Sequence, residues 1–344
     1  MTPAGNARDS ISFEQGTLYL LDQTLLPLRE EYLELHDPAG VVDAIRRLAV
    51  RGAMAIGVAA AYGVVLGATG GKSAGEAPGE AGARAALEMI AASRPTARNL
   101  FWALEQMQAV IEECAGAAMP ELGEKLLSRA DEIANETIES NRRLVSAGQE
   151  VVPRGAGALT HCNSGPLAAL RYGTALGVLI EAHRLGREVH VYVDETRPLL
   201  QGARITAWEL EREGVPYTLL PDSAAAVLME TGRVGMVITG ADRIAANGDT
   251  ANKIGTYALA VLSSAHNIPF YIAAPFSTVD AISATGAGIV IEQRDPDEVR
   301  TCGRRRVAPA GAPVFNPAFD VTPARLISAI ITDRGVFGPP YSFA

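Results

Sequence analysis

Short apolar runs alternate with helix-length segments through the second half of the chain. The apolar runs cover residues 156–161, 188–194, 217–220, 234–239 and 270–274, and the helical patterns cover residues 168–185, 202–212, 224–231 and 256–265. Strands that alternate with helices in this way are typical of right-handed crossovers in a parallel sheet. We therefore predict an α/β domain built on a doubly wound, Rossmann-like parallel sheet.

The first part of the chain carries mainly helical patterns. A buried helix is predicted over residues 55–68, because this apolar stretch is shorter than the roughly 20 residues of a membrane span. Between residues 122 and 145 the apolar positions recur on one helical face, which predicts a long amphipathic helix. We expect a smaller, mainly helical N-terminal domain at 1–128 and a Rossmann-like C-terminal domain at 129–344, with a linking helix at about 121–150.

The composition limits the partners of the chain. Its 344 residues are 48% hydrophobic and 20% charged, which is typical of a soluble globular protein. The formal net charge of -9 argues against a broad surface for nucleic acid or for an anionic membrane, and it leaves room for a small basic pocket. Three widely spaced cysteines favour neither a disulfide framework nor a metal site. Because the N-terminus lacks the apolar core of a signal peptide, we expect a cytoplasmic protein.

The glycine-rich segments do not form a nucleotide-binding motif. Residues 67–73 resemble a phosphate-binding loop, but three residues separate the first Gly from the Gly-Lys pair where that motif has four, so we interpret the stretch as a linker. The turn after the first strand of the sheet reads Asn163-Ser164-Gly165-Pro166, without the Gly-x-Gly-x-x-Gly pattern. A dinucleotide cofactor is therefore disfavoured.

Two chemically active side chains follow predicted strands. Cys162 comes after the run at 156–161, and Asp242 comes after the run at 234–239. The carboxyl ends of parallel strands lie at one edge of a sheet, so this thiol and this carboxyl group are candidates for proton chemistry on one small ligand. A buried structural cysteine and a turn aspartate are the plain alternatives.

The sequence around both residues suits a reactive site. His161 and Asn163 flank Cys162, and backbone amides at the start of the next helix would favour an anionic thiolate. His161 could equally be a partner that orients the site or a catalytic group. Among apolar neighbours the pKa of Asp242 would be raised, so that it could act as an acid near neutral pH.

Basic residues near predicted helix starts are candidates for binding an anion. Arg51 precedes Gly52 at the start of a predicted helix, and Arg94 is a second positive group in the same domain. Residues 252–253 precede another helix, whose amino end suits an anion. A single arginine on a surface has no such meaning by itself.

Five separated motifs occur in one order along the chain. They are Arg51-Gly52-Ala53-Met54-Ala55-Ile56-Gly57, Thr160-His161-Cys162-Asn163, Asp194-Glu195-Thr196-Arg197-Pro198 with Gln201-Gly202, Gly240-Ala241-Asp242-Arg243-Ile244, and Asn252-Lys253-Ile254-Gly255-Thr256. Over nearly the whole chain the sequence closely resembles the methylthioribose-1-phosphate isomerases, whose wider family includes regulatory subunits of a translation-initiation exchange factor. Met54 stands where proline is common in that family, and this change removes no chemical group.

The resemblance implies a homodimeric aldose-ketose isomerase of methionine salvage that uses neither a metal nor another cofactor. Such an enzyme converts 5-methylthioribose 1-phosphate to 5-methylthioribulose 1-phosphate, with Cys162 and Asp242 as the catalytic residues. The residues implied to bind the sugar phosphate are Arg51, Gly52, Ala53, Arg94, Gln201, Asn252 and Lys253.

The chemistry of this reaction suits these residue types. A sugar phosphorylated at C1 has no free aldehyde, so its furanose ring must open while the phosphate stays attached. A neutral Asp242 would protonate the ring oxygen, and Cys162 would move the proton at C2. A direct hydride shift from C2 to C1 is the alternative route.

Three other functions stay open on the sequence. A 5-deoxyribose 1-phosphate differs only at an end of the substrate that an apolar pocket discriminates weakly. Ribose 1,5-bisphosphate would call for a second basic cluster, which the sequence does not suggest. A non-catalytic regulatory subunit would be expected to lack the Cys162 and Asp242 pair that this chain carries.

Overall fold

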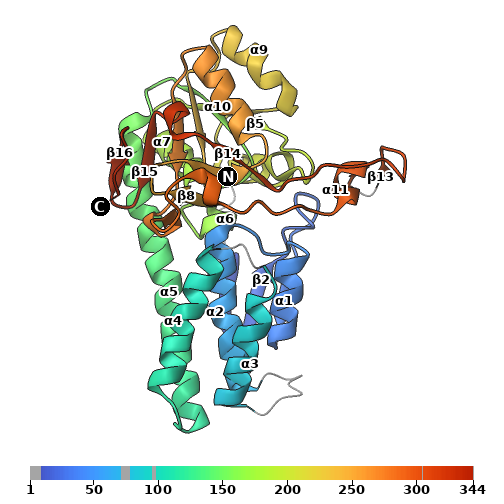
Figure 1. The fold of residues 1–344 in the computed structure, drawn as a ribbon, viewed down its shortest axis with the longest axis vertical. Coiled ribbons are helices and arrows are strands. Elements are labelled where there is room, and N and C mark those ends of the chain that lie inside the picture. The colour runs from blue at the N-terminus through green and yellow to red at the C-terminus, as the bar shows by residue number, and fades with distance from the viewer. Residues whose placement is uncertain (1–8, 71–77, 95–97, 304, 344) are drawn as a thin grey trace. The chain divides into compact units, whose positions relative to one another are not determined.

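The computed structural model describes residues 9–70, 78–94, 98–303 and 305–343. The chain folds into two compact units, one of Met1–Glu139 with Leu167–Arg171 and the other of Ser140–Pro166 with Tyr172–Ala344. Figure 1 shows the helices of the first unit in blue to green and the sheet of the second in green to red. Within the described residues, no helix has the length and apolar character that a membrane span requires.

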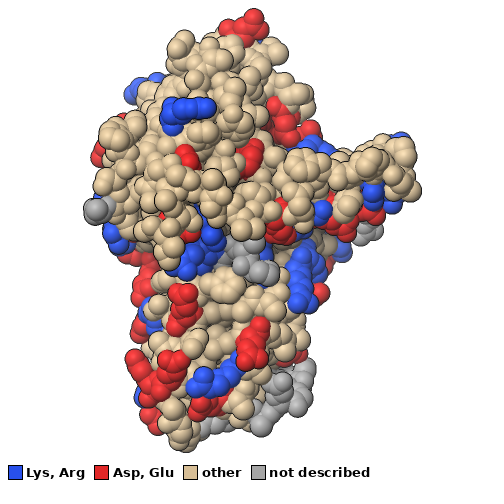
Figure 2. Space-filling model, in the orientation of Figure 1, with Lys and Arg blue, Asp and Glu red and all other residues tan. Residues whose placement is uncertain are grey.

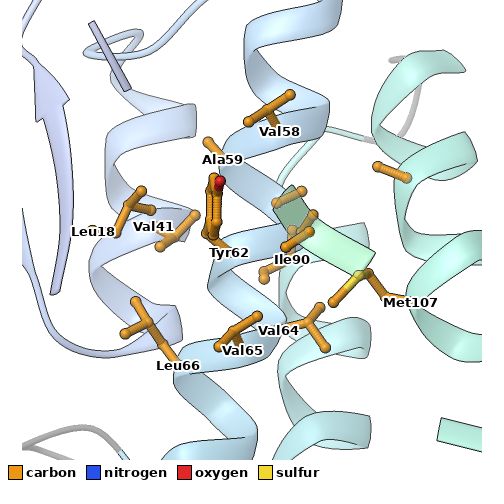
Figure 3. Packing of buried hydrophobic residues seen from close by; sticks show 14 of the residues in the cluster. Leu18, Val41, Val58, Ala59, Tyr62, Val64, Val65, Leu66, Ile90 and Met107 are labelled. Atoms are coloured by element: carbon orange, nitrogen blue, oxygen red, sulfur yellow. The ribbon is translucent and has the colours of Figure 1, made fainter. Parts of the chain in front are cut away.

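The first unit is built around a helix that is buried on all sides. Helix α2 (Ala53–Thr69) is buried from Ala55 to Ala68, as the apolar stretch predicts. It packs against the helices α1 (Pro38–Arg46), α3 (Glu80–Ala91) and α4 (Arg98–Glu113). Figure 3 shows Val41, Ile90 and Met107, which come from these three helices, directed toward α2. The first three residues of the expected linker at 67–73 belong to α2, and residues 71–73 lie outside the described residues.

An antiparallel sheet that the helical patterns do not predict precedes these helices. Its strands pair in the order β1 (Ile11–Glu14), β2 (Thr17–Leu21) and β3 (Tyr32–Leu35). Leu18 and Leu20 are buried in the helical core, and the ring of Phe13 stacks on Tyr62 with centroids 5.1 Å apart. Strands β1 and β3 are only partly buried, so they lack the uninterrupted apolar run that indicates a buried strand.

The long helix α5 (Met119–Gly148) runs from the first unit into the second. Its buried residues Leu126 and Ile133 belong to the first core, and Leu144 and Val145 belong to the second. The predicted amphipathic helix is therefore confirmed, and a short 3-10 turn at Gln149–Val151 follows it.

The second unit contains a doubly wound sheet with the strand order β16-β15-β10-β7-β4-β5-β6. Its strands are β4 (Gly157–Thr160), β5 (His190–Asp194), β6 (Tyr217–Leu220), β7 (Met236–Thr239), β10 (Phe270–Ala273), β15 (Ala329–Thr332) and β16 (Gly335–Phe337). Only the edge strand β16 is antiparallel to its neighbour within this sheet. The chain winds outward from β4 to β6 and then in the other direction from β7 to β15, so the order reverses between β4 and β7.

Helices cover both faces of this sheet, which explains the uninterrupted apolar runs in the sequence. Ala158 and Met236 pack in one core with helix α7 (Ala175–Arg184). Leu159 and Val237 pack in another core with the helices α9 (Ala225–Glu230) and α10 (Thr256–Ala265). Successive residues of a strand point to opposite faces, so each strand needs apolar residues at both positions.

Two predicted helices of the second half are interrupted. Residues 168–185 form the helices α6 (Pro166–Ala169) and α7, because Leu170 and Arg171 adopt φ values of 49° and 45°, which end a right-handed helix. Residues 202–212 begin with a π-helix at Gly202–Thr206 and continue as α8 (Ala207–Glu213). Single π-turns of this kind occur frequently at functional sites.

A smaller sheet follows the strand β7. Its order is β11 (Val279–Asp280), β8 (Arg243–Ala245), β9 (Thr250–Lys253) and β14 (Phe319–Thr322). Between β11 and β14 the chain forms helix α11 (Pro296–Arg300) and the hairpin of β12 (Thr301–Cys302) with β13 (Arg305–Arg306). Figure 1 shows α11 and β13 at the end of an extension of the second unit.

The turn before α2 depends on glycine at position 52. Gly52 has a φ of 98°, and a Cβ there would lie 2.4 Å from the carbonyl oxygen of Ala168. We expect Gly52→Ala to lower the free energy of unfolding by about 3 kcal/mol or more, because backbone strain adds to a clash with main-chain atoms. Urea unfolding followed by circular dichroism would measure this loss.

Gly79→Ala is the matched control for this substitution. Gly79 has a similar φ of 101°, but no atom of the described residues lies within 4 Å of its Cβ position. The free energy of unfolding of Gly79→Ala should fall by only about 1 to 2 kcal/mol, through backbone strain. Equal losses in the two variants would contradict the proposed clash at Gly52.

Candidate active site

Cys162 and Asp242 follow neighbouring strands at the point where the winding of the sheet reverses. Strand β4 ends at Thr160 and β7 ends at Thr239, and these two strands pair in parallel. The Thr160 hydroxyl donates to the carbonyl oxygen of Ile238 over 2.8 Å. A Cβ on Gly240 would lie 3.1 Å from the Cβ of Ser164, so the segments that carry the two motifs meet at one edge of the sheet.

Cys162 is a half-buried residue in a left-handed backbone conformation. Its φ is 61°, a value that non-glycine residues adopt rarely and that costs on the order of 1 to 3 kcal/mol. Its backbone N–H donates to Thr196 Oγ1 over 2.8 Å, and its carbonyl oxygen accepts from Thr206 Oγ1 over 2.6 Å. Each hydrogen bond contributes about 0.5 to 1.5 kcal/mol, so together they offset much of this strain.

The helix that follows Cys162 offers few backbone N–H groups to stabilise a thiolate there. Helix α6 starts four residues after Cys162, spans only Pro166–Ala169, and begins with a proline that has no backbone N–H. A thiolate at Cys162 therefore stays a prediction that depends on the hydrogen bonds and on other charges around the loop.

His161 forms a buried pair with the carboxylate at the end of β5. Its Nδ1 lies 2.9 Å from Asp194 Oδ2, and its Nε2 lies 2.8 Å from the carbonyl oxygen of Ile254. A carbonyl oxygen can only accept, so Nε2 carries a proton in either charge state. One further proton lies between Nδ1 and Asp194, in either an ion pair or a neutral pair. His161 thereby joins the end of β4 to the end of β5 and to the turn after Lys253.

The pKa values of both residues of this pair are raised. Burial alone would lower the pKa of His161, but the hydrogen bond and the charge of Asp194, with the charge of Asp222, raise it. Burial raises the pKa of Asp194, and the contact with His161 offsets this only in part. The folded pair therefore holds a proton that the unfolded residues would release.

A group of possible metal ligands coincides with this pair. Ligand atoms of His161, Asp194 and Asp222 lie within 4.8 Å of one another. Both imidazole nitrogens already face protein oxygens, and the Asp222 carboxylate accepts the backbone N–H groups of Thr196 and Arg197. This arrangement suits a shared proton better than a cation, which would have to displace these bonds.

Asp242 lies at the start of the smaller sheet. Its backbone N–H donates to the carbonyl oxygen of Ala251 over 2.9 Å, and the strands β8 and β9 that follow form a hairpin. The residue is half-buried, a position from which its carboxyl group can meet a ligand. The raised pKa expected for Asp242 stays a prediction.

The two predicted binding residues on β9 have different surroundings. Asn252 Nδ2 donates to Thr256 Oγ1 over 2.9 Å. The Lys253 ammonium donates to the carbonyl oxygen of Ala318 over 2.9 Å and lies 4.8 Å from the centre of the Phe319 ring. Adjacent residues of a strand point to opposite sides, so they are not expected to bind a ligand in the same way.

The amino end of α10 does not offer the anion site that the sequence suggests. The Asp320 carboxylate accepts the backbone N–H groups of Gly255 and Tyr257, at 2.7 and 3.0 Å. Burial raises the pKa of Asp320, and these hydrogen bonds offset that effect in part. A carboxylate of the protein therefore occupies the helix end where the sequence predicts an outside anion.

Gln201 immediately precedes the π-helix. Only 5% of the residue is exposed, and its Oε1 has no hydrogen-bond partner among the described residues. A buried amide oxygen without a partner is costly in a folded protein unless a ligand or water satisfies it. This observation fits the predicted role of Gln201 in binding.

The remaining predicted binding residues belong to the first unit. Arg51 is buried, and Gly52 and Ala53 form the start of α2, which no side chain of the described residues caps. Arg94 follows the end of α3 and is half-buried. The start of α2 thus leaves backbone N–H groups without a side-chain cap beside a cation, which suits a phosphate.

Thr206 and Glu209 lie close to the Cys162 loop, and the sequence pattern did not predict either of them as a site residue. Asn163 Nδ2 donates to Thr206 Oγ1 over 3.1 Å and to the buried carboxylate of Glu209. Both lie on the segment predicted as an ordinary helix at 202–212. Their polar side chains at buried helical positions are the one signal that the sequence contains.

Comparison with known proteins shows the family of the chain. Residues 49–339 match the initiation factor 2 subunit family. The chain belongs to this family. It is similar to the methylthioribose-1-phosphate isomerase of Heliobacterium modesticaldum, which is 53% identical over 97% of this chain and 96% of its own length. The isomerase of Pelotomaculum thermopropionicum is also 53% identical, over 95% of this chain and 90% of its own.

Two solved structures have the same fold as this chain. The crystal structure of 5-methylthioribose 1-phosphate isomerase from Pyrococcus horikoshii matches with a TM-score of 0.90 and 43% identity, covering 98% of this chain and 94% of its own. A structure from A. fulgidus described as the delta subunit of translation initiation factor eIF-2B matches with a TM-score of 0.84 and 41% identity, covering 97% of each chain. The chain therefore has the two-part α/β fold of the initiation factor 2 subunit family.

The proton held by His161 and Asp194 predicts a pH dependence of stability. A histidine with a raised pKa contributes stability that is complete below its unfolded pKa and is lost as the pH rises through its folded pKa. The difference in unfolding free energy between the wild type and His161→Gln should therefore be larger at about pH 6 than at about pH 9. Urea unfolding at both pH values would measure it.

His183→Gln serves as the control for this experiment. His183 is a half-buried residue of α7 outside the His161 cluster. The difference between wild type and this variant should change little over the same range. A His161 difference that grows toward high pH would contradict the retained proton.

Proposed function

We propose that this chain is an aldose-ketose isomerase that converts 5-methylthioribose 1-phosphate to 5-methylthioribulose 1-phosphate in methionine salvage. The observation that carries the proposal is the position of Cys162 and Asp242 after β4 and β7, where the winding of the sheet reverses. Doubly wound sheets bind their ligands at that point. Relatives at about half identity over nearly the whole chain carry the name of this isomerase, which supports the same substrate.

The proposed binding residues provide charge and hydrogen bonds for a sugar phosphate. Arg51 and Arg94, with the backbone at Gly52 and Ala53, are proposed to bind the sugar phosphate. The other residues proposed to bind it are Gln201, Asn252 and Lys253. Acidic and basic side chains are interspersed over the face drawn in Figure 2, which fits a small basic site rather than a broad one.

We propose a proton-transfer route that restores the Cys162 thiolate and the Asp242 carboxyl group at the end of each turnover. The Cys162 thiolate takes the proton from C2, and the electron pair forms a C1–C2 double bond as the bond from C1 to the ring oxygen breaks. The Asp242 carboxyl group gives its proton to that oxygen. The Cys162 thiol then gives a proton to C1, and the Asp242 carboxylate takes the proton of the C2 hydroxyl, which leaves the ketone at C2.

The positive groups stabilise the enol phosphate that this route forms. Its phosphate keeps its charge throughout, so Arg51, Arg94 and Lys253 act on the substrate and on the intermediate alike. Binding energy of that kind lowers KM, whereas Cys162 and Asp242 act only on the reacting atoms and set kcat. The proposed chemistry requires a free thiol, and Cys162 is a free cysteine.

We further propose that the enzyme is a homodimer. Large apolar side chains are exposed on the second unit, at Ile282, Val290, Val307 and Phe315, with exposed fractions from 58% to 94%. Three of them, at 290, 307 and 315, lie on the segment that contains α11 and β13. Contact with a second copy of the chain would remove this apolar surface from water.

Substitution of the two proposed catalytic residues tests the function. Cys162→Ser and Asp242→Asn should each lower kcat for 5-methylthioribose 1-phosphate by about 100-fold to 10,000-fold, because each removes a proton-transfer group. KM should change far less. Steady-state assays with 5-methylthioribose 1-phosphate, 5-deoxyribose 1-phosphate and ribose 1,5-bisphosphate would also rank the substrates.

Cys302→Ser is the matched control, because Cys302 is exposed and lies on β12. Its kcat should equal that of the wild type. Wild-type rates in Cys162→Ser and Asp242→Asn would remove the assignment of both residues. No turnover of any of the three sugars by the wild type would remove the proposed function.

A deuterium label at C2 separates proton transfer from a hydride shift. If Cys162 carries the proton, part of the label should be lost to water, because a thiol exchanges its proton with solvent. Turnover of the C2-deuterated substrate in H2O, with analysis of the product by mass spectrometry, would measure the retained fraction. Complete retention at C1, together with no solvent deuterium incorporated in D2O, would favour the hydride shift instead.

A further inference from the structure

The backbone of Cys162 is held from both sides by threonine side chains. The Cys162 N–H donates to Thr196 Oγ1, and that hydroxyl donates its own proton to the carbonyl oxygen of Asp194 over 3.1 Å. On the other side, Thr206 Oγ1 donates to the Cys162 carbonyl oxygen and accepts from Asn163 Nδ2. Each hydroxyl has a fixed donor direction, and both threonines are completely buried.

Both threonines belong to one segment, and the fold fixes each of them. Thr196 follows the end of β5, where its backbone N–H donates to Asp222 Oδ1 over 2.7 Å. Thr206 is the last residue of the π-helix. Gly202, at the start of that π-helix, packs so closely that a Cβ there would lie 1.8 Å from the carbonyl oxygen of Asp194. The segment from 194 to 206 is thereby fixed against the end of β5.

The held backbone determines where the thiol can point. A residue with a φ of 61° directs its Cβ differently from one in an extended or right-handed conformation, and a released Cys162 would relax toward negative φ. The two hydroxyls bind the N–H and the C=O of the same residue, so they constrain both of its peptide groups. A side chain that only filled space at 196 or 206 would leave those peptide groups free to rotate.

We propose that Thr196 and Thr206 are positioning residues, whose hydroxyls hold Cys162 in its left-handed conformation and so direct its thiol to the substrate. The importance of this for turnover rests on the proposed catalytic role of Cys162. Neither threonine is required to touch the substrate. Their effect is therefore on the reacting group and not on the binding of the phosphate.

Isosteric variants test the hydroxyls separately from the shape of the side chains. Thr196→Val and Thr206→Val should lower kcat by about tenfold or more and change KM by less than about threefold, because sugar-phosphate binding does not use these hydroxyls. Thr196→Ser and Thr206→Ser keep the hydroxyl and should recover kcat to within about threefold of the wild type. Thr278→Val is the matched control, since Thr278 is completely buried and its Oγ1 has no hydrogen-bond partner among the described residues.

Alkylation of Cys162 gives a second measurement that does not depend on isomerase activity. Iodoacetamide would be applied to the folded protein, and labelling of Cys162 and of the exposed Cys302 would be followed by peptide mass spectrometry. The ratio of the Cys162 rate to the Cys302 rate should rise by about threefold or more in the valine variants, because a half-buried thiol gains mobility. It should stay at the wild-type value in the serine variants and in Thr278→Val.

The outcomes distinguish this proposal from the proposed function. Unchanged kcat and an unchanged alkylation ratio in both valine variants would overturn the positioning role. Equal losses of kcat in the serine and valine variants would also overturn it, because the hydroxyl would then not be the group that positions Cys162. If the wild type turned over none of the sugars, the proposed function would fail, and the alkylation ratio would still decide whether the threonines hold Cys162. If either valine variant did not fold, the other would carry the comparison with its serine partner.

Discussion

The pairing of β4 with β7 is the contact on which the candidate site depends. These two strands are far apart in sequence, yet they lie side by side because the chain reverses its winding between them. The segments after both strands therefore reach the same edge of the sheet. Without that pairing, nothing in the sequence would place the residues of the two motifs close together.

Around this edge the protein uses buried polar contacts to hold several loops in register. His161 contacts Asp194 at the end of β5 and the carbonyl oxygen of Ile254 after β9. Thr196 and Thr206 hold the backbone of Cys162. Each of these groups has a partner, which keeps the cost of burying it low. Two hydrogen bonds thus hold the backbone that carries the thiol, which suits proton transfer because that step requires defined distances.

The hydrophobic pattern predicts the elements that are long or strongly periodic. The helices α2 and α5 and the strands from β4 to β10 of the main sheet follow it closely, because an element buried on both faces or along one stripe needs an apolar residue at each inward position. The N-terminal sheet and the small sheet that contains β9 do not follow it. Strands β1 and β3 are only partly buried and so lack an uninterrupted apolar run, and β9 pairs with β14 from a distant part of the chain.

The sequence by itself determined the α/β class, the order of the strands from β4 to β10 along the chain, and the presence of a cysteine and an aspartate after two apolar strands. Local periodicity and residue type contain that information. Only the tertiary structure decided that Asp320 occupies the amino end of α10, that residues 202–206 form a π-helix, and that two threonine hydroxyls hold Cys162. The physical reason is that the contacts of Asp320 and of the two threonines join residues many positions apart, so their energies depend on distances that arise only when the sheet has formed.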